Sequence, residues 1–133
     1  MSVWILKVFK MHTINSVVIL ENCKDKLGRE YDPAEVMMQA VSKGPIYGEL
    51  GVGKDTQVDL SRASHVVKNL RLEHNSLVGD IEILTTPMGV IASELYKHGV
   101  ELKTSIRALG KVDTNGAIRN FELIAIDFLE VAK

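Results

Sequence analysis

A threonine followed by a proline, Thr86-Pro87, marks the start of a helix past the middle of the chain. The threonine hydroxyl can cap free backbone N–H groups, and proline suits the first helical turn because its missing N–H needs no partner there. Lys97-His98-Gly99 is typical of a helix end. Between the two ends, apolar residues recur with helical spacing: Met88, Ile91, Ala92 and Leu95. This stripe predicts a helix that packs one face on a sheet.

Strands are predicted on both sides of this helix. Residues 80–84 alternate polar and apolar side chains, and residues 100–107 do the same. In the second strand, Ser105 and Arg107 share one face with Glu101 and Lys103, because successive strand residues point to opposite faces. Any chemistry of the chain is therefore expected on that face.

The other segments predict more strands and one more helix. Asp32-Pro33-Ala34-Glu35 has the form of a capping box, and Lys43-Gly44-Pro45 ends the helix that follows. Asn115-Gly116 is the signal of a tight hairpin. Strand patterns cover residues 3–9, 17–20, 64–72, 77–84 and 121–131. We therefore expect one α+β domain over residues 1–133, with a mostly antiparallel sheet that curls toward a barrel and two short helices against it.

The composition excludes several classes of partner. Sixteen Lys and Arg against seventeen Asp and Glu leave a net charge of −1, so neither nucleic acid nor a membrane surface is expected to bind. The first ten residues resemble a strand more than a signal peptide or a membrane span, and an intracellular protein is expected. The single cysteine, Cys23, cannot form an internal disulfide.

No cofactor or metal is expected either. Gly48 to Lys54 has the spacing G-x-x-x-x-G-K of a phosphate-binding loop, but Asp55 stands where that loop needs Ser or Thr to hold Mg²⁺. An ordinary loop is therefore favoured. The Cys and His residues lack zinc spacing, and the acidic residues of the loops lack the spacing of a calcium site.

Three residues could carry catalysis. Ser105 beside Arg107 suggests a nucleophile next to a group that stabilises a developing oxyanion. His65 is the candidate base, because the pattern places it on the polar face of a strand with Asn69, Arg71 and Glu73. On spacing alone, a solvated strand face and a structural histidine explain the same residues.

Three segments together resemble the prohead proteases of tailed phages, serine proteases of head maturation that share a fold with the herpesvirus capsid-assembly protease. The segments are GREYDPAEVMMQAV, YGELGVGKDTQVDLSRASHVVKNL and GDIEILTTPMGVIASELYKHGVELKTSIRALGKV. The most specific parts are the Thr-Pro-Met-Gly helix start and the Ser-x-Arg-x-Leu-Gly pattern. This resemblance covers most of the chain and implies a prohead-protease-like fold.

The resemblance also assigns roles and exposes departures from the pattern. Ser105 falls on the family's nucleophile and Arg107 on its arginine, but Val52 stands where the family has its catalytic histidine. Ile106 and Ala108 replace a serine and a glycine of the same pattern. A valine cannot accept a proton, so the resemblance implies a relative that keeps the fold without the catalysis.

Two functions follow as expectations. The first is a structural or assembly protein of a phage head, such as a decoration, cement or core component, that binds the major capsid protein or scaffold and associates with copies of itself. It would be found in the host cytoplasm during assembly and in the prohead or virion. The alternative is an active maturation protease that cleaves capsid or scaffold proteins, with Ser105 as nucleophile and His65 as a substitute base. A third possibility is a barrel that binds a small ligand, but no feature of the sequence indicates it specifically.

Overall fold

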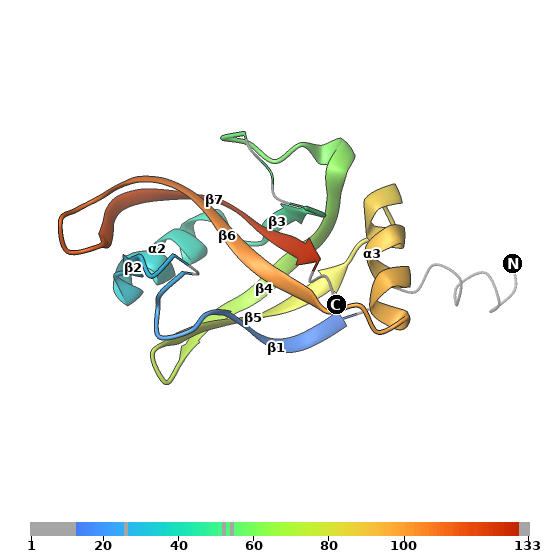
Figure 1. Cartoon of the computed structure of the whole chain (residues 1–133), viewed down its shortest axis with the longest axis horizontal. Coiled ribbons are helices and arrows are strands. Elements are labelled where there is room, and N and C mark those ends of the chain that lie inside the picture. Colours follow the sequence, from blue (N-terminus) through green and yellow to red (C-terminus); the bar gives the residue numbers. More distant parts are fainter. Residues whose placement is uncertain (1–12, 26, 52, 54, 131–133) are drawn as a thin grey trace, which may run out of the picture.

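The computed structural model describes residues 13–25, 27–51, 53 and 55–130. Seven strands, two α-helices and one short 3-10 helix are found within these ranges (Figure 1). The strand predicted for residues 3–9 lies outside the described residues. The elements are β1 Thr13–Leu20, β2 Glu30–Tyr31, α2 Pro33–Lys43, β3 Ile46–Glu49, η1 Leu60–Arg62, β4 Ala63–Glu73, β5 Ser76–Ile83, α3 Pro87–Lys97, β6 Leu102–Val112 and β7 Ala117–Glu130.

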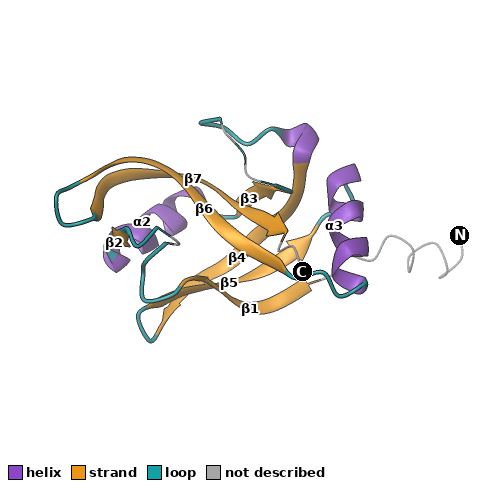
Figure 2. Ribbon diagram, viewed as in Figure 1, coloured by secondary structure: helices purple, strands orange, loops and turns teal. Residues whose placement is uncertain are grey.

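The strands form two sheets that curl around a common core (Figure 2). The larger sheet has the order β1-β5-β4-β3 with antiparallel neighbours, and the smaller has the order β2-β7-β6 with only β2 parallel. The sheets meet where β3 lies beside β7, and Leu50 bridges to Phe128 there. No strand pairing joins β1 to β6 in the described part of the chain, so the barrel stays open. The expected α+β fold is confirmed in this curled, unclosed form.

Both helices begin where their capping residues predict. The Thr86 hydroxyl accepts a hydrogen bond from the Gly89 N–H at 3.1 Å, and the Asp32 carboxylate accepts one from the Ala34 N–H at 3.0 Å. The capping box at Asp32 is only half formed, however. The Glu35 carboxylate accepts the N–H of Phe121 in β7 instead of turning back to its own helix.

The inward face of α3 follows the predicted stripe at three of its four positions. Ala92 is buried and Met88 and Leu95 are partly buried against the core, whereas Ile91 is exposed. Gly89 is buried as well, and an added Cβ there would collide with the carbonyl oxygen of Leu84. The helix backbone approaches the sheet so closely that only glycine fits, and the small residues therefore face inward.

Two irregularities bend the larger sheet around Asp80 in its central strand β5. The pairing shifts register in β1 next to Ser16 and in β4 next to Asn69, and both residues have positive φ. The Asp80 carboxylate accepts the Ser16 N–H at 2.9 Å and the Asn69 amide at 3.0 Å. Bulges of this kind increase twist, so one carboxylate stabilises the curl on both sides.

The bulge in β4 also changes which of its residues are buried. All five residues from Ala63 to Val67 are buried, and exposure begins only at Lys68. The predicted placement of His65 on a polar face is therefore wrong. β7 covers the face that carries His65, and α3 packs against the same strand.

The core unites apolar residues of both sheets and both helices, including Leu20, Val36, Ile81, Ala92 and Phe128. Neither α2 nor α3 has the length and apolar character that a helix needs to cross a membrane, and the described residues hold no other α-helix.

Candidate functional site

Ser105 and Arg107 lie on one face of β6, as the alternation predicts. In the register between β6 and β7, Ser105 is opposite Asp127 and Arg107 is opposite Ala125. Residues that face each other across an antiparallel pair share a face of the sheet. A hydroxyl, a guanidinium and a carboxylate are thus brought together, and Asp127 is a member of the group that the sequence analysis missed.

Arg107 is held between two buried carboxylates. Its Nη2 lies 2.9 Å from Glu49 Oε2 and 3.2 Å from Asp127 Oδ1. The side chains of Arg107, Glu49 and Asp127 are only 12%, 4% and 1% exposed. The guanidinium is therefore neutralised by protein groups, and little of its charge remains for a developing oxyanion.

The same three side chains fasten the segment that follows β3. Asp127 Oδ1 accepts the Glu49 N–H at 3.0 Å, and Asp127 Oδ2 accepts the Gly53 N–H at 3.3 Å. Arg107 Nη1 donates to the Asp55 carbonyl at 3.0 Å. The Arg62 guanidinium completes the cluster, with its Nε 3.2 Å from Glu49 Oε1. We call Glu49, Arg62, Arg107 and Asp127 the seam cluster, because they join the two sheets where β3 meets β7.

The two carboxylates of the seam cluster differ in their electrostatics. Burial acts to raise the pKa of Glu49, but the hydrogen bonds from Arg107, the Asp59 N–H and Arg62 outweigh it and lower that pKa. Burial also acts on Asp127, and there it prevails, so its pKa is raised despite the bonds from Glu49 and Gly53 N–H groups and the charge of Arg107. Burial therefore determines the direction of the pKa shift at Asp127, whereas hydrogen bonds determine it at Glu49.

Both ring nitrogens of His65 have hydrogen-bond partners. Nε2 lies 2.6 Å from the carbonyl oxygen of Ile126, which can only accept, so Nε2 carries the proton. Nδ1 lies 2.7 Å from the Ser64 hydroxyl, which therefore donates to the remaining lone pair. The ring also stacks on Phe128, with centroids 3.8 Å apart.

Burial makes this histidine a poor base. His65 and Ser64 are both fully buried, and burial lowers the pKa of His65 to about 4, although the bond to the Ile126 carbonyl opposes the shift. No hydrogen bond in the described part of the chain joins His65 to Ser105. The structure therefore brings Ser105 and Arg107 together and gives His65 other partners.

Val52, at the position where the resemblance expects a histidine, lies outside the described residues. Its neighbours are bound to β7: the Gly51 N–H donates to the Phe128 carbonyl at 2.8 Å, and Gly53 donates to Asp127. The other described histidines are elsewhere, His74 in the turn before β5 and His98 at the end of α3.

Among the described residues, no group of three or more His, Cys, Asp or Glu side chains is arranged to hold a metal ion. The acidic residues of the seam cluster are instead satisfied by arginines and backbone N–H groups.

The sequence around Asp127 contains one signal that could have identified this residue as a member of the site. It is an acidic residue with apolar neighbours on both sides, in a strand that the pattern predicts to be buried. A buried carboxylate needs a partner, and Arg107 on the neighbouring predicted strand was available. Glu49 could not be found this way, because it belongs to a different sheet.

Comparison with known proteins adds the fold relationship. No family model and no curated protein matches this sequence. The solved structure of the bacteriophage T4 capsid assembly protease, gp21, superposes with a TM-score of 0.68 over 88% of this chain and 89% of that chain, at 18% sequence identity. At this identity the match shows a shared fold, here the prohead-protease-like fold.

Proposed function

We propose that this protein is a non-catalytic component of a phage head that uses a prohead-protease-like fold to bind other head proteins. The main support for the proposal is the hydrogen bonding and burial of His65. Its protonated nitrogen donates to a backbone carbonyl, its lone pair is taken by Ser64, and the whole ring is buried. Serine hydrolysis needs a base that can reach the nucleophile, and Ser105 has no such partner among the described residues.

Two further observations support the same role. Arg107, the expected oxyanion partner, is held by Glu49 and Asp127 in the seam cluster. In the resemblance to the prohead proteases, Val52 falls at the position of the catalytic histidine. The matching solved structure is that of a bacteriophage T4 capsid assembly protease, which supplies the biological setting of the proposal.

Coexpression with the major capsid protein and scaffold of the parent phage tests the absence of catalysis. We expect no cleavage product that depends on Ser105, because loss of the base removes several powers of ten of rate in serine hydrolases. Ser105→Ala is the matched control. A product seen with the parent chain and absent with Ser105→Ala would show an active protease and overturn the proposal.

Sedimentation of proheads and heads tests the structural role. We expect the chain to band with the particles, and mass spectrometry of the gradient fractions would detect it. A stable contact with the shell or with further copies should bury more than about 1,000 Å² in total. Recovery of the chain only from the free protein fraction, at every stage of assembly, would exclude the role.

A further inference from the structure

The outward face of α3 carries apolar side chains that no described part of the chain covers. Val90 is 52% exposed, Ile91 is 47% exposed, and Pro87 is exposed one turn earlier. Residues three and four apart lie side by side on a helix, so these three form one continuous surface, which we call the α3 patch. A helix face that meets water normally carries polar residues. The α3 patch is therefore of the kind that packs against another segment.

The sequence before β1 has a matching character. Residues 3–9 read VWILKVF, so six of the seven are apolar, and a run of this composition is rarely left in water. Lys7 and Lys10 supply positive charge, and Glu94, the only acidic residue of α3, lies one turn beyond the α3 patch. Glu94 pairs with Lys97 at 3.6 Å, but both side chains are at least half exposed, which leaves the carboxylate accessible to a second cation. The segment and the helix face are complementary in polarity and in charge.

The chain enters β1 at the end of the sheet where α3 begins (Figure 1). In the antiparallel pair of β1 and β5, Thr13 is opposite Glu82, close to the end of β5 that leads into α3. Ile14 of β1 and Leu95 of α3 are partly buried against the same core. The described start of β1 and the helix therefore lie at the same end of the fold.

The lengths agree as well. Residues 10–12 can span about 10 Å when extended, which is about the diameter of a helix. They can therefore carry residues 3–9 from the edge of the sheet to the outward side of α3. Seven extended residues cover about 23 Å, whereas α3, with 11 residues, is about 16 Å long. Residues 3–9 are long enough to cover the whole α3 patch.

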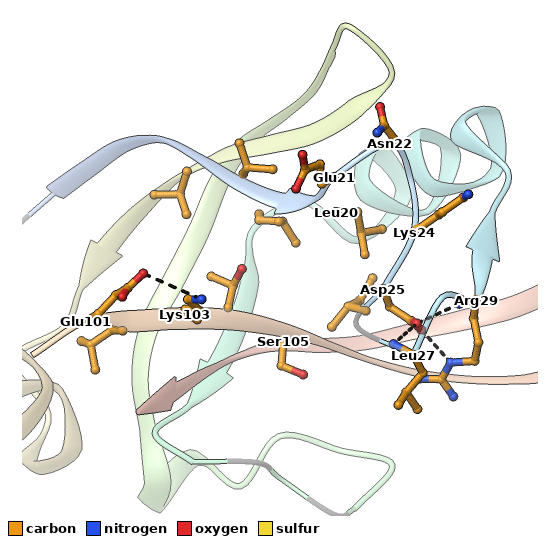
Figure 3. Close-up of a pocket in the computed structure, with 16 residues that line it drawn as sticks. Leu20, Glu21, Asn22, Lys24, Asp25, Leu27, Arg29, Glu101, Lys103 and Ser105 are labelled. Carbon is orange, nitrogen blue, oxygen red and sulfur yellow. Dashed lines mark hydrogen bonds and ion pairs between the residues drawn. The ribbon is translucent and has the colours of Figure 1, made fainter. Parts of the chain in front are cut away.

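A groove lined by β1, β6 and the segment before β2 offers a less suitable cover. It encloses about 800 Å³, and three acidic and three basic side chains line it (Figure 3). Along β1 it is lined by residues 17–20, in the half of the strand away from Thr13. An apolar segment in this groove would take water from the charged groups without replacing their hydrogen bonds. The α3 patch has no charged group that would lose water in this way.

We propose that residues 3–9 dock on the outward face of α3, with apolar side chains against Val90 and Ile91 and a lysine beside Glu94. This contact explains why Ile91, a member of the predicted apolar stripe, is turned away from the core: it faces a second apolar layer. The inference goes beyond the head role proposed above and does not depend on it, because it concerns a contact within one chain. It also assigns the α3 patch to the chain itself, so that other proteins would bind other faces of the fold.

The fluorescence of Trp4 tests the proposal, because Trp4 is the only tryptophan of the chain and lies in the docking segment. In the folded full chain we expect its emission to be shifted to the blue and only weakly quenched by acrylamide, and we expect urea to abolish both effects. Emission at the wavelength of free tryptophan, with full quenching in the folded chain, would overturn the proposal.

A matched pair of variants locates the contact. Ile91 and Val112 are both 47% exposed, and Val112 ends β6 at the tip of the β6–β7 hairpin, on the opposite side of the molecule from α3 (Figure 1). A lysine at either exposed position should leave the fold intact. Ile91→Lys places a positive charge against an apolar segment that itself carries lysines, so it should bring the acrylamide quenching of Trp4 close to its value in urea. Val112→Lys should leave the quenching unchanged. Equal quenching in the two variants would overturn the assignment to α3.

A second variant guards against misfolding of the first. Val90→Lys alters the other exposed side of the α3 patch, at a position that is 52% exposed, and circular dichroism measures whether each variant keeps its helices. We expect Val90→Lys to expose Trp4 as Ile91→Lys does. Shielding of Trp4 that persists in a folded Val90→Lys variant would overturn the proposal, and would point to the groove or another face as the cover.

The protein concentration distinguishes the segment of the same chain from that of a second copy. We expect Trp4 to stay shielded on dilution and in a sample that light scattering shows to be monomeric. Shielding that is lost on dilution, or that is found only in a dimer, would mean that the segment docks on another copy, and would overturn the contact within one chain.

Discussion

At the scale of single residues, the burial of His65 makes the stability of the fold depend on pH. Its pKa is lowered to about 4, whereas an unfolded chain takes up this proton near pH 6.5. Stability is therefore complete above pH 6.5 and falls as the pH is lowered toward 4, because the unfolded state binds the proton first. The difference corresponds to about 3 kcal/mol.

Urea denaturation at a series of pH values checks this dependence. We expect the free energy of unfolding to fall between pH 6.5 and 4, and His65→Gln to remove most of that slope. The exposed His98 offers a control, since His98→Gln should retain it. A slope that survives unchanged in His65→Gln would assign the pH dependence to another group.

The packing around His65 also restricts the residue at position 48 to glycine. Gly48 lies opposite His65 in the ladder, and an added Cβ would collide with the Ile126 carbonyl and the His65 ring. Gly48→Ala should therefore cost at least about 3 kcal/mol, since backbone cannot move aside easily. Gly28 is the control: its φ is +79° but the space around it is open, so Gly28→Ala should cost only about 1 kcal/mol. Equal losses in denaturant midpoint would contradict the packing argument.

At the scale of elements, α2 stabilises the edge of β7. Gln39 donates to the Phe121 carbonyl and accepts the Leu123 N–H, so one amide satisfies two backbone groups. Gln39→Leu keeps the size of the side chain and leaves both groups without a partner. We expect a loss of about 2 kcal/mol in the free energy of unfolding.

Met38, the preceding residue of the same helix, provides the comparison because it is exposed. Met38→Leu should change the free energy of unfolding by less than about 0.5 kcal/mol. Chemical denaturation of both variants would separate the effect of the lost hydrogen bonds to the edge of β7 from the effect of helix propensity. Similar values for the two would mean that the amide contributes nothing to the edge.

Elements that depend on neighbouring residues could be predicted from the sequence. Thr86 and Asp32 cap their helices by contacts within three residues, and the alternation on β6 correctly places Ser105 and Arg107 on one face. The predictions fail where contacts between distant segments determine which side chains are buried. β7 buries His65, and α3 approaches the sheet closely at Gly89 while Ile91 faces outward. No local pattern contains either contact.

At the scale of the whole molecule, the seam cluster joins the two sheets. Arg107 is the only described group that donates to both Glu49 and Asp127 side chains. Removing it would leave the buried Asp127 carboxylate without a counter-charge and Glu49 with Arg62 alone. Arg107→Met should therefore destabilise the fold by about 3–5 kcal/mol, as measured by chemical denaturation.

Two comparisons make this prediction specific. Arg71→Met removes an arginine from the exposed pairs with Glu73 and Asp80 and should cost much less. Asp127→Asn should partly rescue Arg107→Met, because it removes the uncompensated charge. Purely additive losses in the double variant would show that Arg107 and Asp127 are not coupled.

The position of the seam cluster in the chain has a consequence for the order of folding. β6 and β7 form a hairpin around the turn at Asn115-Gly116, which closes early because its contacts are local. The contact from Glu49 to Asp127 spans 78 positions, so its loop-closure entropy is lost before the contact is gained. Seam variants should therefore accelerate unfolding while leaving the refolding rate nearly unchanged. The open barrel would then be assembled as a hairpin that docks last onto the four-stranded sheet, and its kinetic lifetime would be set by the seam.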